Sequence, residues 1–244
     1  MQVFVIDYCI NHALKRQGVV TVKKIICALV CFFSALFILT PLYACEKPTR
    51  YEKYVSLLRQ DIYCGNYKDL TVTAEYGFKE TPFTNDACAR ERVYGFTFFI
   101  PIIPDEIKRT VSFTENGKTY SANFTVNEIT SEYTAFIETE PIDVKAFTAD
   151  IFSGSEIISV SFSSVVPENA VSYKNALSAL EKEQSPLLSS FTENGEFKAE
   201  LYLKIFVKNE KPFWYVGIAY GNDRLKAFLL DGFTAETLAI REIA

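Results

Sequence analysis

Histidine is almost absent from this 244-residue sequence, since its single example, His12, lies ahead of the one long apolar run. A chain cut after that run would contain no histidine, which excludes Ser–His and Cys–His catalysis and histidine-ligated zinc. The sequence also has no glycine-rich phosphate loop and no Cys-x-x-Cys pair. We therefore expect no catalytic residue, no metal ion and no cofactor, and we expect that the protein is not an enzyme.

Positive charge is scarce as well. From residue 45 onward the chain has 21 Lys+Arg against 29 Asp+Glu, a net charge of −8. Proteins that bind nucleic acids need a basic surface to neutralise phosphates, so this balance argues against a nucleic acid as partner. Hydrophobic residues make up 49% of the chain and aromatic residues 15%, which is ample for a packed core and argues against disorder.

The apolar run covers residues 25–40 and follows two lysines. A positive flank, an apolar core of about 15 residues and small residues beyond it are typical of a secretion signal. The run leads into "LYAC" at 42–45, which resembles the lipobox of bacterial lipoproteins. In that family a peptidase cuts before the cysteine, whose sulfur carries a diacylglycerol; Tyr43 departs from the usual small or hydroxyl residue. The resemblance implies a lipid on Cys45 and an extracytoplasmic protein anchored to the cell membrane.

Two other interpretations of this segment stay open. The uncharged stretch from Ile25 to Cys45 is long enough to cross a bilayer without being cleaved. Ordinary cleavage after Ala44 would release the protein with no lipid.

Residues 1–21 form an unusually long and mixed segment ahead of a signal. The peptide "QGV" at 17–19 can be encoded by a ribosome-binding sequence, and a GTG codon at Val22 could then start translation. We therefore expect the signal peptide to span 22–44 and residues 1–21 to be an artefact of start-site choice. A genuine cytoplasmic extension is the alternative.

Strand-like alternation dominates residues 45–166. Apolar side chains alternate with polar ones over 70–78 and 94–100, and Asn116-Gly117 has the two residues that a type I′ hairpin turn requires. Further alternating segments are 132–138, 143–152 and 156–166. We expect an antiparallel β-sandwich of immunoglobulin-like type. Apolar residues at helical spacing over 48–63 predict a short leading helix.

The pattern changes at Pro167, where we place a domain boundary. Residues 167–184 have a helical apolar stripe, and four alternating segments follow, so residues 167–244 predict a helix with a four-stranded antiparallel sheet, an α+β unit. Tyr202 and Phe206 share a strand face with lysines. They either form a binding patch or pack under the helix or against the first domain.

The C-terminal sequence "KPFWYVGIAYGNDRLKAFLLDGFTAETLAIRE" resembles the PepSY domain. Trp214 and Val216 take the place of that family's aromatic–x–Val pair. Asp231, Thr234 and Leu238 take the places of its terminal hairpin, although an alanine at 235 stands where the family usually has glycine. The resemblance over 168–244 implies a secreted binding or peptidase-regulating module, and it implies no catalytic residues.

The hairpin residues Asp231, Gly232 and Thr234 also have a purely structural interpretation. The aspartate and threonine oxygens can accept backbone N–H groups of the turn, and glycine permits a positive φ. We expect these three residues to serve the backbone rather than a ligand.

Two cysteines, Cys64 and Cys88, follow the signal region. Outside the cytoplasm such a pair predicts a disulfide, and two separate thiols are the alternative.

Acidic residues offer two weak candidates for a carboxylate-based active site, which needs two opposed carboxylates. Glu80 and Asp86 flank Phe83, and Asp105 is followed by Glu106. Such pairs are usually solvated loop charges, so we do not expect catalysis there.

Together these features predict a lipid-anchored extracytoplasmic binding or regulatory protein with an unknown protein or peptide partner, one version being the restraint of a secreted peptidase. A carboxylate-based hydrolase of cell-wall or polysaccharide substrates is one alternative. A structural envelope protein without a discrete ligand is another.

Overall fold

The computed structural model describes residues 49–83, 88–101, 107–128, 130–221 and 224–243. The chain divides into two compact units, Met1–Glu46 and Lys47–Ala244, and all the described residues belong to the second. Residues 1–21, the signal region 22–44 and Cys45 lie outside the described residues.

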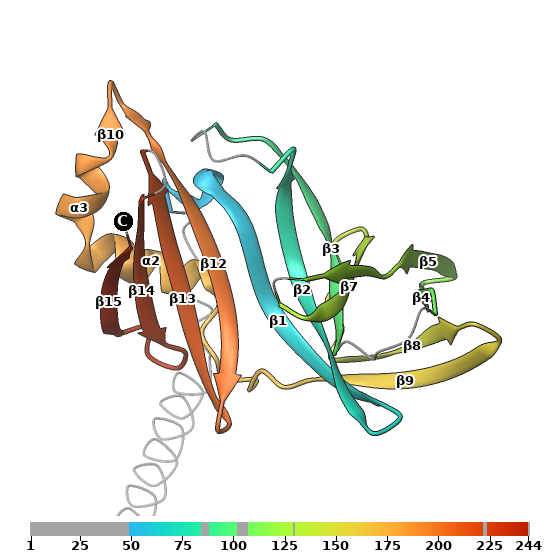
Figure 1. The fold of residues 1–244 in the computed structure, drawn as a ribbon. Helices are drawn as coiled ribbons and strands as arrows, with labels where there is room; N and C mark the ends of the chain where they lie inside the picture. The colour runs from blue at the N-terminus through green and yellow to red at the C-terminus, as the bar shows by residue number, and fades with distance from the viewer. Residues whose placement is uncertain (1–48, 84–87, 102–106, 129, 222–223, 244) are drawn as a thin grey trace, which may run out of the picture. The chain divides into compact units, whose positions relative to one another are not determined.

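The described part of the chain is mostly β (Figure 1). A 3-10 turn, η1 (Glu52–Tyr54), and two helices, α2 (Tyr173–Glu183) and α3 (Ser185–Ser190), accompany the strands. The strands are β1 (Val55–Tyr67), β2 (Leu70–Thr81), β3 (Glu91–Pro101), β4 (Arg109–Glu115), β5 (Lys118–Asn123), β6 (Thr125–Asn127), β7 (Glu132–Glu138), β8 (Ala146–Ser153), β9 (Glu156–Ser164), β10 (Thr192–Glu193), β11 (Glu196–Phe197), β12 (Ala199–Lys208), β13 (Lys211–Tyr220), β14 (Arg224–Asp231) and β15 (Thr237–Ile243).

Thirteen of these strands form one sheet, with the order β15-β14-β13-β12-β1-β2-β3-β7-β6. Strands β4, β5, β8 and β9 branch from this path, and β9 returns to pair with the end of β1. Every neighbouring pair is antiparallel except β1 and β12, which run parallel with Val55 opposite Leu201. The strand β1 therefore joins the N-terminal and C-terminal halves of the unit.

The predicted fold class is wrong, although the predominance of strands is confirmed. Strands β12–β15 do not form a separate PepSY-like sheet under a helix, because β12 continues through β1 into β2 and β3. The strands before residue 166 likewise do not close into a free-standing immunoglobulin-like sandwich, because β1, β2, β3 and β7 belong to that same sheet. Two separate sheets would each leave an unpaired edge strand. Here β1 and β12, which would be those edge strands, pair with each other.

The predicted leading helix over 48–63 is also wrong, because most of this segment is β1. The register of β1 shifts between Val55 and Leu57 and again between Arg59 and Asp61. A bulge adds one residue to the strand, so side chains on one face are spaced by three rather than two at that point. Val55 and Leu58 therefore face the same core at a spacing that imitates a helix.

Shorter elements agree better with their sequence signals. Asn116 and Gly117 have φ values of 52° and 75° and join β4 to β5, which confirms the predicted hairpin. Helix α2 begins at Tyr173, later than predicted, because Ser172 is its N-cap and its hydroxyl accepts the backbone N–H of Asn175.

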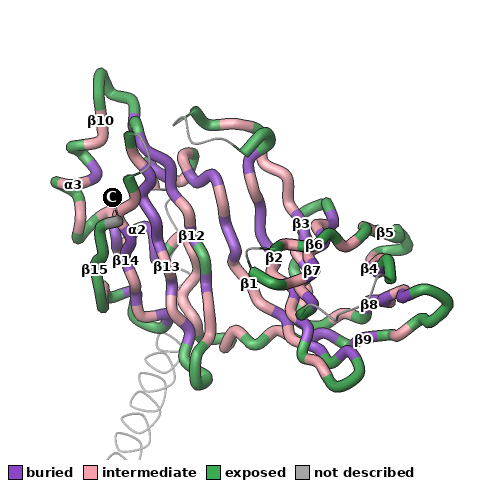
Figure 2. The backbone as a smooth tube through the Cα atoms, viewed as in Figure 1, coloured by how far each residue is buried: buried purple, intermediate pink, exposed green. Residues whose placement is uncertain are grey.

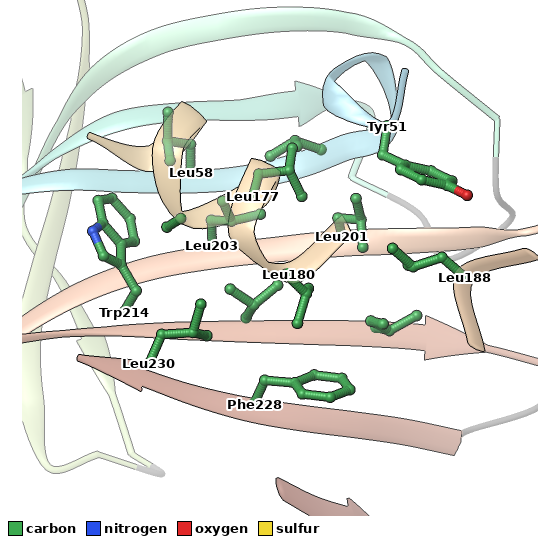
Figure 3. Packing of buried hydrophobic residues seen from close by; sticks show 14 of the residues in the cluster. Tyr51, Leu58, Leu177, Leu180, Leu188, Leu201, Leu203, Trp214, Phe228 and Leu230 are labelled. Atoms are coloured by element: carbon green, nitrogen blue, oxygen red, sulfur yellow. The ribbon is translucent and has the colours of Figure 1, made fainter. Parts of the chain in front are cut away.

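Two hydrophobic clusters lie on the same face of the long sheet. In the first, Leu177 and Leu180 of α2 pack over Leu203, Trp214 and Phe228 (Figure 3). In the second, β4, β8 and β9 cover β1–β3 and β7 with a group of aromatic rings. Strand β2 shows why one face serves both: Val72, Ala74, Tyr76 and Phe78 alternate along it, and the last of these reaches the first cluster.

Candidate functional site

The opposite face of the sheet has half-buried side chains that belong to neither cluster, and we call it the open face. Because side chains alternate along a strand, the residues between the core positions of β12–β14 point to this side. Buried and intermediate positions alternate over residues 212–216 of β13, and Figure 2 shows this colouring along the strand. The open face is defined by Arg59, Glu75, Lys79, Phe136, Tyr202, Lys204, Phe206, Phe213, Tyr215, Leu225 and Leu229.

A cluster of three charges lies where β1, β2 and β12 meet on the open face. Glu75 Oε2 is 3.5 Å from Arg59 Nε, and Glu75 Oε1 is 3.0 Å from Lys204 Nζ. The parallel pairing of β1 with β12 places Arg59 beside Lys204. Arg59 is only 8% exposed, and desolvation lowers its pKa while the charge of Glu75 opposes that shift. One carboxylate thus pairs with a nearly buried arginine and with a lysine that is half exposed.

Lys79 extends this cationic region along β2. Its Nζ lies 3.9 Å from the centre of the Phe136 ring, a cation–π contact. Burial lowers the pKa of Lys79, and the charge of Arg59 lowers it further. Within the cluster of Arg59, Glu75 and Lys204 the accessible charge is positive, because the side chain of Lys204 is 46% exposed whereas that of Glu75 is 15% exposed.

A second carboxylate, Glu200, is nearly hidden at the beginning of β12. It is 2% exposed and accepts the hydroxyl of Tyr202 at 3.1 Å. Burial, followed by the charge of Glu200, raises the pKa of Tyr202, so this hydroxyl stays protonated. The ring of Tyr202 also contacts Phe83, with the ring centres 5.8 Å apart.

Two glycines let aromatic rings lie along the open face. A β-carbon on Gly217 would come within 3.2 Å of the Tyr215 ring, and one on Gly95 would come within 2.9 Å of the Phe136 ring. The rings therefore occupy the space that side chains would otherwise fill. Phe206 and Phe213 stack on each other, with ring centres 5.4 Å apart, on β12 and β13. The open face thus has flat apolar surfaces as well as cations.

This arrangement offers contacts that are suited to binding. Half-buried aromatic rings offer a large contact area at a small cost in conformational entropy, and cations bind carboxylates. Tyr202 and Phe206 lie on the open face and belong to neither cluster, so the alternative of packing under the helix is excluded. The position of Arg59 was not predicted, because the β1 segment has a helical spacing in the sequence.

The C-terminal turn has the structural geometry expected for Asp231 and Thr234. Asp231 Oδ1 accepts the backbone N–H groups of Phe233 at 2.8 Å and Thr234 at 3.0 Å, which lowers the pKa of Asp231. Thr234 Oγ1 accepts the N–H of Glu236 at 3.3 Å. The positive φ lies at Ala235 (61°) rather than at Gly232. The glycine is needed for space, because a β-carbon there would lie 2.5 Å from the carbonyl of Pro212.

The structure does not join Cys64 and Cys88 by a disulfide. Cys64 is half-buried on β1, and burial raises its pKa, whereas Cys88 is exposed. Of the carboxylate candidates, Glu80 is 1% exposed, and its Oε1 accepts the backbone N–H of Arg90 at 3.1 Å. Asp86, Asp105 and Glu106 lie outside the described residues.

Among the described residues, no group of three or more His, Cys, Asp or Glu side chains could hold a metal ion. None of the helices in the described ranges has the length and apolar character needed to cross a membrane. No protein-family model, curated protein or solved structure matches the chain.

Proposed function

We propose that the protein is a lipid-anchored extracytoplasmic binding protein that holds a protein or peptide partner on the open face. One observation supports this most directly. Both hydrophobic clusters lie on one face of the long sheet, and the other face has half-buried aromatic rings, the half-buried Lys79 and the exposed Lys204. Clustered aromatic residues are typical of the positions that contribute most to binding between proteins.

The partner's chemistry follows from the charges of the open face. Lys204 and Lys79 would meet carboxylates of the partner, and Tyr215, Phe206 and Phe213 would pack against its apolar side chains. A segment that mixes acidic and apolar residues, such as a surface segment of a secreted peptidase, has both features. Charge complementarity would mainly raise the association rate and select the partner.

The anchor is tested by labelling cells with a palmitate analogue. We expect the wild-type protein to incorporate the label and the Cys45→Ser variant to incorporate none, because the sulfur is the point of attachment. The signal of the purified protein on a gel measures incorporation. Ser34→Ala, a change within the apolar run, serves as a control that should keep the label. Label that survives in Cys45→Ser would refute the anchor.

The binding face is tested by placing a photo-crosslinking amino acid at Tyr215 on the open face or at Lys182 on α2. We expect irradiation of living cells to give a discrete crosslinked product from position 215 and none from position 182. Adding Lys79→Gln and Lys204→Gln should reduce the yield at position 215 at least tenfold, which corresponds to about 1.4 kcal/mol of binding free energy.

The matched control for that variant is Lys108→Gln with Lys182→Gln, because both of these lysines are exposed and lie away from the open face. It removes the same charge and should leave the yield at position 215 unchanged. If no discrete product forms at position 215, the open face holds no partner, and a structural envelope role accounts better for the protein.

A further inference from the structure

Cations surround two shallow hollows at the beginning of the described chain. The wider hollow has about 790 Å³ of space open to solvent and is lined by Thr49, Arg50, Glu52, Lys53 and Arg92. The second, of about 360 Å³, shares Arg50 and Lys53 and is walled by Tyr51, Tyr54 and Phe197, together with Thr192 and Gly195. Arg50 and Lys53 therefore stand between the two hollows.

The local charge is positive although the chain as a whole is acidic. Arg50 Nε lies 3.3 Å from Glu181, yet the arginine side chain is 59% exposed. Lys53 Nζ lies 4.8 Å from the centre of the Tyr54 ring, and the Arg92 guanidinium lies 4.5 Å from that of Phe78. These ring contacts hold the cations in place without neutralising them.

The carboxylate of Glu52, which lines the wider hollow, already has partners of its own. Its Oε1 accepts the hydroxyl of Tyr173 at 2.9 Å and lies 3.8 Å from Lys174 Nζ. The backbone oxygen of Glu52 accepts Arg92 Nη2. Counting Lys174, four cations surround this place. The nearby carboxylates are Glu52, Glu181 and Glu196, and Glu196 is itself paired with Lys198, so a positive surplus remains for an anion.

We infer that Arg50, Lys53 and Arg92 form a binding site for a phosphate group, which the headgroup of an anionic membrane lipid supplies. The assignment to a lipid rests on the proposed anchor at Cys45. Arg50 is five residues beyond that cysteine, so an extended chain keeps the two within about 18 Å. Each headgroup layer of a bilayer is roughly 5–7 Å thick. A lipid on Cys45 therefore keeps these cations within reach of the headgroup phosphates.

The tether explains how so open a site could work. An anchored chain meets lipid phosphates at a high effective concentration, so a low intrinsic affinity is enough. Binding there would also orient the unit. Strand β12 begins beside η1 and ends at Lys208, roughly 30 Å away, at the opposite end in Figure 1. Headgroups bound at η1 would leave the far end of the open face, at Phe206 and Phe213, standing away from the membrane.

The test measures hydrogen exchange of the full chain, purified from membranes and placed in vesicles. Three samples are compared: phosphatidylcholine vesicles, vesicles with a third of phosphatidylglycerol, and phosphatidylcholine vesicles with inorganic phosphate in solution. The readout is exchange at residues 50–54, where η1 is held by the bond from the Tyr54 N–H to the Tyr51 oxygen. Each cation near an anionic surface strengthens binding about fivefold. With more than one cation at the site, we expect phosphatidylglycerol to slow the exchange of the residue 50–54 amides by about tenfold or more.

Two double variants decide whether the cations cause the slowing. Arg50→Gln with Lys53→Gln should abolish it, and Lys208→Gln with Lys211→Gln, which removes the same charge at the far end of β12, should not. Exchange within β13 in the same samples reports whether each variant is folded. If inorganic phosphate slows exchange and phosphatidylglycerol does not, the site binds phosphate in solution and not a lipid headgroup. The absence of slowing in both phosphate-containing samples would overturn the site.

The phosphate sample also separates this site from the proposed anchor. If Cys45 takes no label in cells, inorganic phosphate in solution still tests whether these cations bind a phosphate group. If the protein takes the label but neither phosphate source slows exchange of the η1 amides, the anchor is supported and the phosphate site is refuted.

Discussion

Replacing Gly77 with alanine should lower the free energy of unfolding by about 3 kcal/mol, at the upper end of overpacking effects. Gly77 lies on β2 opposite Arg59 of the bulged strand β1. A β-carbon there would lie 1.9 Å from the carbonyl oxygen of Leu58, 2.6 Å from its carbon and 3.0 Å from the Cα of Arg59. All three atoms are backbone, so no change of rotamer can relieve the collision. Urea unfolding followed by circular dichroism measures the loss.

The matched control is Gly195→Ala in the turn between β10 and β11. Nothing lies within 4 Å of a β-carbon there, but φ is +82°, so the cost is conformational and about 1–2 kcal/mol. A loss for Gly77→Ala no larger than that for Gly195→Ala would contradict the close approach of β1 to β2. The close approach lies directly beside the bulge between Arg59 and Asp61, where Arg59 is opposite Gly77.

Local patterns in the sequence identified many elements correctly. The segment 132–138 is β7, and the Asn116-Gly117 turn joins β4 to β5, because alternation and turn chemistry depend only on neighbouring residues. The helix and four strands after Pro167 also exist as α2 and β12–β15. Their assignment to an independent domain failed, since the pairing of Val55 with Leu201 joins residues far apart in the chain.

The candidate site was predictable only in part, for the same reason. Alternation placed Tyr202 and Phe206 on one face with lysines, and the structure keeps them there. Whether anything covers that face depends on where α2 packs, and strand periodicity contains no such information. The face on which Arg59 lies could not be predicted, because two bulges give the apolar residues of β1 a helical spacing in the sequence. Glu75 lies in the alternating segment 70–78, but its partners come from β1 and β12, which only the folded sheet brings together.

Replacing Glu75 with glutamine should destabilise the protein by about 3 kcal/mol, because it leaves a nearly buried arginine without its counter-charge. Arg59 is 8% exposed, and besides Glu75 its guanidinium donates to the Leu58 carbonyl at 3.2 Å. Desolvation already lowers the pKa of Arg59, and the carboxylate is what opposes that shift. Lys204 would lose its partner too, but its side chain is 46% exposed and water can replace that contact.

A double-mutant cycle separates the buried charge from simple packing. Arg59→Met removes the cation and keeps much of the stem, so adding Glu75→Gln to it should cost less than about 1 kcal/mol. The control pair is Lys68 with Glu156, whose charged atoms are closer, at 2.8 Å, but whose side chains are about half exposed. Glu156→Gln should therefore cost less than about 1 kcal/mol, because burial rather than distance decides the value of an ion pair. If Glu75→Gln cost no more than Glu156→Gln, the charge cluster would be no more than a surface contact, and the dry, positive character of the open face would have to be abandoned.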